Sequence, residues 1–191
     1  MPSAELGPAQ RRAVYAIALD SLRAAVTGRP RVLHADDTPA GLERRGAAFV
    51  TLHRHGMLRG CIGTVDAYRP LAEDIAANAA AAALRDPRFP ALRPAELDDL
   101  ELEVAVLSEP TPLTFATEND LLGQLRPGQD GLVIECAGRR ATFLPSVWEQ
   151  LPESADFLAA LKRKAGLDAG TACKGLSAWV YSVESVDAGD A

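Results

Sequence analysis

The sequence predicts an α+β fold in which helices pack on a mostly antiparallel sheet. Apolar residues recur at helical spacing in several segments, and they alternate with polar residues in others. The order hairpin, helix, strand also occurs twice along the chain, at about residues 46–108 and 128–187. Each half alone is too small to bury much apolar surface. We therefore expect one domain over residues 1–191, with two intertwined repeats that form one curved sheet.

Composition narrows the classes of function. Of the 191 residues, 48% are hydrophobic and 24% are charged, which is typical of a folded globular protein. The formal net charge of −6 disfavours binding to nucleic acid or to anionic membranes. No apolar run is long enough to span a bilayer, and residues 1–5 lack the pattern of a secretory signal. These features predict a cytoplasmic protein.

The cysteines also argue against several kinds of site. Cys61, Cys136 and Cys173 are widely spaced and form no CxxC or CxxH pair, so no metal is expected. The simplest interpretation is three reduced thiols, as is usual in a cytosol. The sequence holds no GxxxxGK[ST], HExxH or GxSxG pattern and no GxGxxG after a strand, and the cofactor, if the protein uses one, is unknown from the sequence.

The first half begins with a helix over Pro8–Thr27, where apolar residues recur at helical spacing and Gly28 ends the pattern. A hairpin follows, because Phe49–His53 and Leu58–Val65 both favour strands. His55-Gly56 lies between these strands and suits a two-residue turn.

This turn predicts a register for the hairpin. A two-residue loop places Leu52 opposite Arg59 and Val50 opposite Cys61, and a slip of one residue would invert the two faces. Arg59, Cys61 and Gly63 then share one face of the second strand, while the residues between them share the other.

After the hairpin, an alanine-rich helix is predicted over Pro70–Leu84, and its small side chains imply close packing. The two prolines of Asp86–Pro90 end it in a rigid turn. Leu100–Leu107 alternates apolar and polar residues and predicts a strand.

The second half has the same order of elements. Its predicted segments are a linker over Ser108–Pro127 with a short helix at Glu118–Leu125, a hairpin of Leu132–Cys136 and Arg139–Leu144, a helix over Ser154–Ala165 and a strand over Ala178–Val186. The basic cluster Lys162-Arg163-Lys164 is interpreted as the last turn of the helix, rather than as an RNA-binding patch.

The main candidate for a functional site is the segment Arg59-Gly60-Cys61-Ile62-Gly63. Two glycines inside a strand weaken it, and they are informative where a ligand must approach the backbone closely. The alternative is a sharply bent strand that the alanine-rich helix crosses. Both interpretations of Gly60 and Gly63 stay open at this point.

Cys61 and Glu103 are the candidate catalytic residues. As a thiolate, Cys61 is a nucleophile or a metal ligand, and Arg59 beside it would favour the anion. The alternative is a small buried apolar side chain. Glu103, on the polar side of its strand, is a candidate general acid or base, and a solvated carboxylate is the default alternative.

The remaining candidates are residues for substrate binding. The planar guanidinium of Arg59 suits a carboxylate or a phosphate, although an ion pair with Glu103 or Asp86 is the alternative. In the rigid turn, Asp86 is expected to cap backbone N–H groups, and Arg88 to point into a cleft with Phe89 beside it. Capping and packing are the more usual roles for such a turn.

Taken together, these segments resemble the AMMECR domain family, whose prokaryotic members are called AmmeMemoRadiSam system protein A. The matching residues are Phe49-Val50-Thr51-Leu52, Leu58-Arg59-Gly60-Cys61-Ile62-Gly63-Thr64, Pro70-Leu71, Asp86-Pro87-Arg88-Phe89, Glu96-Leu97, Glu103-Val104-Ala105-Val106-Leu107-Ser108, Gly131-Leu132, Phe143-Leu144-Pro145 and Lys164-Ala165-Gly166-Leu167. The resemblance covers most of the chain, and the Arg-Gly-Cys-Ile-Gly run is specific when the other blocks follow in order.

The resemblance implies a duplicated α+β unit with a curved sheet and a biochemical activity that is not established. It also implies two partners, a Memo-like protein related to extradiol dioxygenases and a radical S-adenosylmethionine protein, and so a place in a redox or modification pathway. Carried over by position, the candidate site is Arg59, Gly60, Cys61 and Gly63, with Asp86, Arg88, Phe89 and Glu103 around it. The chain is then either an enzyme acting on a small anionic metabolite or a modified residue, or a scaffold that positions the two partners.

Overall fold

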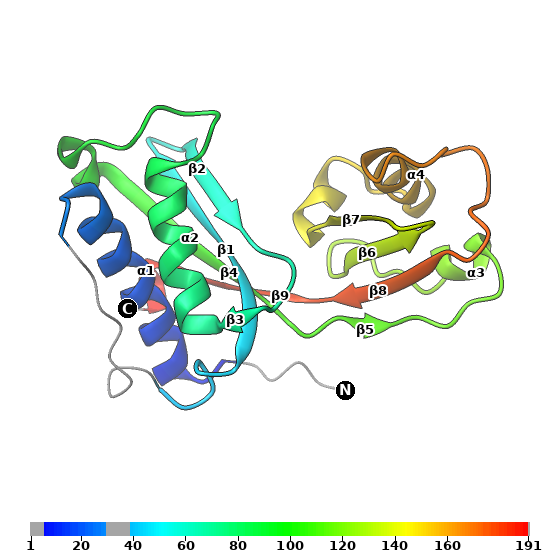
Figure 1. Ribbon diagram of the computed structural model, residues 1–191, viewed down its shortest axis with the longest axis horizontal. Coiled ribbons are helices and arrows are strands. Elements are labelled where there is room, and N and C mark those ends of the chain that lie inside the picture. The colour runs from blue at the N-terminus through cyan, green and yellow to red at the C-terminus, as the bar shows by residue number, and fades with distance from the viewer. Residues whose placement is uncertain (1–5, 30–38, 191) are drawn as a thin grey trace. The chain divides into compact units, whose positions relative to one another are not determined.

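The computed structural model describes residues 6–29 and 39–190, which form two compact units (Figure 1). Unit 1 comprises Met1–Leu107 and Glu184–Ala191, and unit 2 comprises Ser108–Val183. Each unit holds an antiparallel sheet and helices, so the α+β class is confirmed. The strands form two sheets, however, and the prediction of one shared sheet is corrected in this respect. Residues 1–5, on which the expectation about a secretory signal depends, lie outside the described part.

Unit 1 consists of a sheet and two long helices. Its elements are α1 (Pro8–Val26), β1 (Arg45–Arg54), β2 (Met57–Gly63), β3 (Arg69–Pro70), α2 (Leu71–Leu84), the 3-10 helix η2 (Pro94–Asp99), β4 (Leu100–Leu107), β9 (Val183–Val186, from Glu184 on) and the 3-10 turn η4 (Ala188–Asp190). The strand order is β2-β1-β4-β9, and β3 pairs with β1. Figure 1 shows α1 and α2 side by side along this sheet. The predicted helices and the strand Leu100–Leu107 are confirmed to within one residue.

The core of unit 1 lies between the two helices and one face of the sheet. Val50 and Leu52 of β1 are fully buried there, as is Val104 of β4. Because side chains alternate along a strand, the residues between them lie on the opposite face. The alanines of α2 add little bulk, so the backbone of this helix lies close to the sheet, at Gly60 above all.

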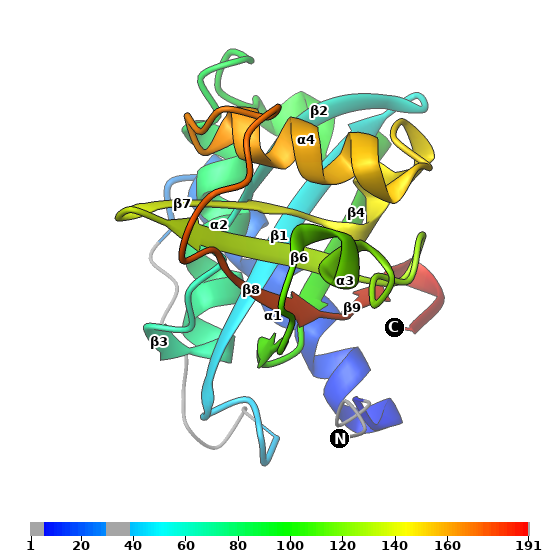
Figure 2. The same ribbon diagram turned by 90° about the vertical axis from the view of Figure 1, so that its right-hand side faces the viewer.

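Unit 2 contains the second sheet and its own small core. Its elements are β5 (Thr111–Pro112), α3 (Glu118–Leu122), β6 (Gly131–Cys136), β7 (Arg139–Phe143), the 3-10 helix η3 (Pro145–Glu149), α4 (Ser154–Lys164) and β8 (Ser177–Tyr181). The strand order is β5-β8-β6-β7, and Figure 2 shows β7, β6 and β8 in that sequence. Leu132 and Ile134 of β6 face Phe157 of α4 in the core, where Trp148 stacks on Phe157 with ring centroids 3.8 Å apart.

The predicted strand over Ala178–Val186 is two strands in the structure, and this break explains the two sheets. β8 pairs with β6, whereas β9 pairs with β4. Between them, Ser182 donates its N–H to the Ser108 hydroxyl (2.9 Å) and accepts the Ser108 N–H at its carbonyl (2.9 Å). These two bonds tie the chain leaving β4 to the chain leaving β8.

The two sheets share one topology, which supports the predicted duplication. In each unit the first strand of a hairpin lies between its partner and a third strand, as β2-β1-β4 and β7-β6-β8. The fourth strand of each sheet, β9 or β5, follows directly in sequence from the third strand of the other. That the whole chain is one domain stays a prediction.

The prediction of three reduced thiols is wrong for two of the cysteines. Cys136, at the end of β6, forms a disulfide with Cys173, which lies 37 residues later in the segment before β8. Cys61 is the free cysteine. A spacing of 37 residues carries no local signal of pairing, because connectivity depends on how the fold brings the two residues together.

Candidate functional site

The predicted hairpin of unit 1 is confirmed, with a β-bulge that the sequence did not indicate. Its two-residue turn is His55-Gly56, where φ is 52° and 73°. Beyond the turn, the pairing of β2 with β1 passes from Leu58 directly to Gly60. Arg59 is the extra residue of the bulge, and bulges commonly redirect a side chain.

The predicted register is therefore wrong by one residue beyond the bulge. Leu52 lies opposite Gly60 instead of Arg59. The same shift places Cys61 opposite Thr51. Gly60 faces α2, whereas Cys61 lies on the opposite face of the sheet, away from the buried side chains of β1.

Arg59 is occupied by partners within the fold. Its Nε and Nη2 donate to the two carboxylate oxygens of Glu96 at 3.0 and 3.2 Å, and its Nη1 donates to the Pro90 carbonyl at 3.0 Å. The Arg59 side chain is 14% exposed. The expected ion pair of Arg59 is thus real, but its partner is Glu96 rather than Glu103 or Asp86.

Sequence reasoning gave Glu96 no role, although a signal was present. Pro94 begins the 3-10 helix η2, and Glu96 accepts the Arg93 N–H at 2.9 Å, which is the capping arrangement of a glutamate near a helix start. The guanidinium of Arg59 and this N–H lower the pKa of Glu96 from 4.5 to about 2. Glu96 is therefore an ionised structural carboxylate.

Asp86 and Arg88 bind the backbone of β2 at Cys61. The buried Asp86 carboxylate accepts the Cys61 N–H at 2.8 Å, and Arg88 donates to the Cys61 carbonyl at 3.1 Å. Arg88 also donates to both oxygens of Asp86, at 2.7 and 3.0 Å, and this pairing holds the pKa of Asp86 well below its usual range. The predicted capping role of Asp86 is what the structure shows.

These contacts satisfy the backbone hydrogen-bonding groups of Cys61 on the outer edge of the sheet. Both backbone groups of Cys61 point away from β1, which is the arrangement of an antiparallel pair without mutual hydrogen bonds. Exposed edge groups invite pairing with another strand, and natural sheets cover them. We name the pair Asp86 and Arg88 the edge clip.

Cys61 and Glu103 lie on the same face of the sheet but on strands that are not neighbours. Thr51 of β1 lies between them and pairs with both, and its hydroxyl donates to the half-buried Cys61 Sγ at 3.3 Å. Two strand spacings separate Cys61 from Glu103, about 10 Å between backbones. Glu103 instead accepts from the Ser185 hydroxyl at 2.7 Å. A direct proton transfer between the two predicted catalytic residues has no support in this geometry.

The two glycines serve packing within unit 1. A Cβ on Gly60 would lie 2.3 Å from the Ala82 carbonyl oxygen of α2, and one on Gly63 would lie 2.2 Å from the Phe49 side chain. Of the two interpretations left open, the bent strand crossed by the alanine-rich helix is the one that the structure shows at Gly60.

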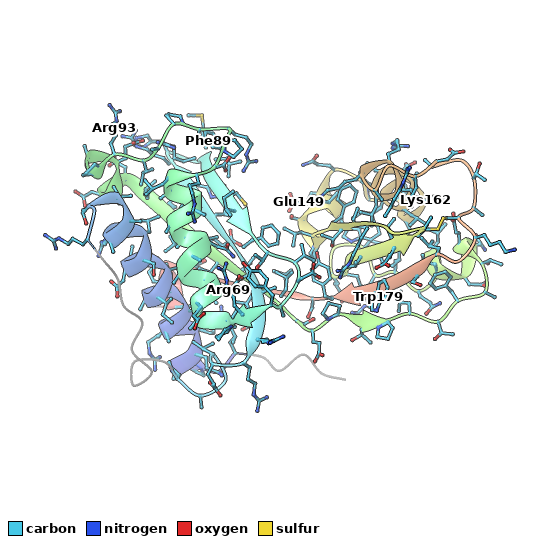
Figure 3. All side chains as sticks on the ribbon, in the orientation of Figure 1. Arg69, Phe89, Arg93, Glu149, Lys162 and Trp179 are labelled. Carbon is cyan, nitrogen blue, oxygen red and sulfur yellow. A yellow bond between two sulfur atoms is a disulfide. The ribbon has the colours of Figure 1, made fainter. Side chains whose placement is uncertain are left out.

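Phe89 and the arginine before it complete the turn after α2. Phe89 is half-buried, its N–H donates to the Asp86 carbonyl at 3.2 Å, and the Arg88 guanidinium lies 5.5 Å from its ring centroid. Figure 3 shows Phe89 in this turn, with Arg93 further along the same connection. The turn is therefore held by its own contacts and by β2.

Beside these paired polar groups lie exposed apolar side chains. Met57 and Leu58 of β2 are 71% and 39% exposed, and Leu84 at the end of α2 is 39% exposed. The strand and the turn that follows α2 lie side by side, since the edge clip joins them at Cys61. We name Met57 and Leu58 the hairpin tip.

A second buried carboxylate in unit 1 was also missed. Asp74, in the first turn of α2, is fully buried and accepts from the Ala48 N–H (2.9 Å), Arg69 (2.8 Å), Asn78 (2.9 Å) and Thr64 (2.5 Å). Arg69 is labelled in Figure 3. These bonds anchor α2 to β1, a structural role that residue type alone does not reveal.

The described residues form neither a cluster suited to a metal ion nor a helix suited to a membrane. Within residues 6–29 and 39–190, no group of three or more histidine, cysteine, aspartate or glutamate side chains is arranged to hold a metal ion. Nor does that part of the chain contain a helix with the length and apolar character needed to cross a membrane.

The structure thus defines a duplicated α+β protein, and comparison with known proteins assigns its family. The model of the AMMECR1 family matches residues 15–186, so the chain belongs to this family. The predicted resemblance is confirmed. A relative from Methanothermobacter thermautotrophicus is 36% identical over 168 residues, which are 87% of this chain and 88% of the relative. A relative from Thermotoga maritima is 42% identical over 127 residues, 65% and 69% of the two chains.

A solved structure shares the fold. The crystal structure of an uncharacterized protein from Pyrococcus horikoshii matches with a TM-score of 0.78 and 29% sequence identity. The match covers 90% of this chain and 88% of that one. The names of these relatives state no activity, and the chain accordingly belongs to a family of uncharacterised proteins.

Proposed function

We propose that the chain is a non-catalytic binding module of an AmmeMemoRadiSam-type redox or modification pathway, where it positions Memo-like and radical S-adenosylmethionine proteins. One observation carries the choice of binding over catalysis. The charged side chains around Cys61 are bound to one another and to the backbone, whereas the apolar side chains of the hairpin tip are exposed.

The state of Arg59 supports this choice. A substrate-binding arginine is open to its ligand, but the Arg59 side chain is 14% exposed and each of its guanidinium nitrogens donates a hydrogen bond within the fold. Asp86 likewise accepts from Cys61 and Arg88. To bind an anion at Arg59 would leave the buried Glu96 carboxylate without its main partner, which is costly.

The hairpin tip has the character of a contact surface. Met57 and Leu58 follow one another in β2, so their exposed side chains lie on opposite faces of the hairpin, and Met side chains are enriched in protein–protein contacts. A partner that covers the tip from both faces would bury both side chains. A hairpin with a tight turn also presents these side chains on a rigid support, which reduces the entropy lost on binding.

The test is binding to the two predicted partners. The double variant Met57→Asp with Leu58→Asp should lower partner recovery in co-purification at least tenfold, since it places two charges in a contact that excludes water. The matched control is Tyr68→Ser, which removes an exposed apolar side chain (57%) elsewhere in unit 1. Equal recovery of both partners with the double variant and the wild-type chain would refute the proposed surface.

A second candidate function rests on the Cys61 thiol. Cys61 is a free, half-buried cysteine whose Sγ accepts the Thr51 hydroxyl, and it faces away from the helices. A ligand or catalytic site there predicts that Cys61→Ser abolishes pathway output while both partners still bind. A binding module predicts that Cys61→Ser changes neither.

A further inference from the structure

The ammonium group of Lys162, which was predicted only as part of the last turn of a helix, is buried in unit 2. Its side chain is 1% exposed, and Nζ donates to both carboxylate oxygens of Glu118 at 3.0 and 3.1 Å. It also donates to the Thr171 carbonyl at 2.7 Å. A buried charge is tolerated when it is paired and its donors are satisfied, and these three contacts meet that condition. Lys164, two residues later, is exposed.

The cover over this ion pair comes from the segment Leu167–Leu176, which connects α4 to β8. Thr171 of this segment supplies a carbonyl to Lys162, and Cys173 donates its N–H to Glu118 at 3.1 Å. Figure 3 labels Lys162, a residue of α4. Lys162 also donates to the Ala169 carbonyl of the segment at 3.5 Å. Lys162 therefore has two hydrogen bonds to the segment, and Glu118 has one.

Between its ends, the segment has few other contacts with the rest of unit 2. Its middle residues are mostly exposed. The Asp168 carboxylate accepts hydrogen bonds from Gly170 and Thr171, which belong to the segment itself. Segments with few buried apolar contacts open at low free energy. The covalent attachment is the disulfide from Cys173 to Cys136, a residue of β6 that is 2% exposed.

We propose that the Cys136–Cys173 disulfide is a redox switch that holds the segment Leu167–Leu176 closed over Lys162. While the disulfide is intact, Thr171 and Cys173 stay in place and the Lys162–Glu118 pair is covered. After reduction the segment opens, water reaches the ammonium, and Lys162 becomes accessible from solvent. The switch lies in unit 2 and is independent of the binding proposed for unit 1.

The chemistry of the switch is a thiol–disulfide exchange with a dithiol reductant. A thiolate of the reductant attacks Sγ of Cys173, which is half-buried, while Cys136 is buried. The Cys136–Cys173 bond breaks, a mixed disulfide forms, and Cys136 leaves as a thiolate. The second thiol of the reductant then releases Cys173. Two electrons and two protons pass to the protein, which becomes the dithiol, and the reductant becomes a cyclic disulfide.

The lysines of the chain allow a direct test, because the sequence contains only Lys162, Lys164 and Lys174. The full-length protein is acetylated with an amine-reactive ester with or without dithiothreitol, and modification at each lysine is followed by mass spectrometry. Reduction should raise the rate at Lys162 roughly tenfold or more. Lys164 serves as the internal reference and should change little, since it is exposed before reduction.

Two variants separate the switch from general loosening. Cys173→Ser should give rapid acetylation of Lys162 without reductant, whereas Cys61→Ser should behave like the wild-type chain. A rate at Lys162 that is unchanged after the disulfide is broken would overturn the proposal. Tryptophan fluorescence is followed in parallel, because Trp148 lies in the core of unit 2. A fluorescence change that accompanies exposure of Lys162 would mean global unfolding and would also overturn the proposal. So would slow acetylation of Lys162 in a purified protein that lacks the disulfide.

Discussion

Around Cys61, two carboxylates that resemble catalytic groups by residue type serve as fixed acceptors. Asp86 accepts the Cys61 N–H, and Glu96 accepts the Arg59 guanidinium. Each also accepts at least one further N–H, so the ionised form is favoured and both pKa values are lowered. A general acid or base works best with a pKa near the working pH, and neither group meets this condition.

The lowered pKa of Glu96 gives a prediction for stability against pH. Its contribution is complete above pH 4.5, the ordinary value, and is lost as the pH falls toward about 2, because the unfolded chain then binds the proton more tightly. In Glu96→Gln, this part of the acid dependence should disappear in urea unfolding measured from pH 6 to 2. Glu101→Gln, at an exposed position, is the control and should keep the wild-type dependence.

A second prediction concerns Gly60. The substitution Gly60→Ala forces a methyl group to 2.3 Å from the Ala82 carbonyl oxygen, so α2 or β2 must move. We expect a loss of about 1–3 kcal/mol in the free energy of unfolding, measured with denaturant. Gly123→Ala is the matched control, because its new Cβ would meet nothing within 3.8 Å and its φ of −68° suits alanine. Equal stability of the two variants would show that α2 does not constrain β2.

At the scale of helices and strands, the edge clip explains why the turn after α2 contains charged residues around a proline. Pro87 limits the backbone between Asp86 and Arg88, and both side chains reach the same residue of β2. The clip satisfies a backbone N–H and a carbonyl that no neighbouring strand takes up. It therefore fixes the end of a helix to the edge of a sheet.

The clip predicts a local effect on exchange. Asp86→Asn should raise the hydrogen-exchange rate of the Cys61 amide well above that of the β1 amides, because the charged acceptor is replaced by a weaker one. Asp99→Asn changes an exposed carboxylate that pairs with Arg54 at 2.9 Å, and it should leave Cys61 protected. A protected Cys61 amide in the Asp86 variant would contradict the role of the clip.

Local patterns predicted most elements to within a few residues. The hairpin of unit 1 shows both the strength and the limit of such patterns. Its turn follows from His55-Gly56, but the bulge at Arg59 depends on Glu96 and Pro90, which lie more than 30 residues away. A register is set by such distant contacts as well as by the turn.

The candidate site, like the hairpin, was predicted only in part from the sequence. The turn of Asp86 and its capping role are local and were predicted, whereas the partner of Arg59 was not. The disulfide of Cys136 and the burial of Lys162 also depend on how unit 2 folds. Among the features that were not predicted, only Glu96, the partner of Arg59, has a recognisable pattern in the sequence, which is its capping position after Pro94.

For the whole molecule, the main feature is the origin of the fourth strands. β5 follows β4 in sequence but joins the sheet of unit 2, and β9 follows β8 but joins the sheet of unit 1. One continuous strand was predicted for β8 and β9, because the apolar alternation does not mark the change of sheet at Ser182. The sheet of unit 1 is therefore complete only when β9, which lies near the end of the sequence, has paired with β4.

This order of assembly gives a prediction for a shortened chain. Removal of residues 183–191 exposes the edge of β4 and removes the fully buried Val186, as well as Glu184 and Asp190, which bind Arg11 of α1. The melting temperature should fall by on the order of 5 °C. A chain that ends at Asp187 keeps β9 and should lose less. Equal melting temperatures for the shortened and full chains would contradict the role of β9.

The reactivity of Cys61 tests most directly whether the molecule binds partners rather than catalyses a reaction. Under non-reducing conditions Cys61 is the free thiol, and its rate of alkylation by iodoacetamide at pH 7 is measured against a small-molecule thiol. We predict that the half-buried Cys61 reacts no faster than the reference. Alkylation of Cys61 ten times faster than the reference would contradict the account and would favour a catalytic thiol.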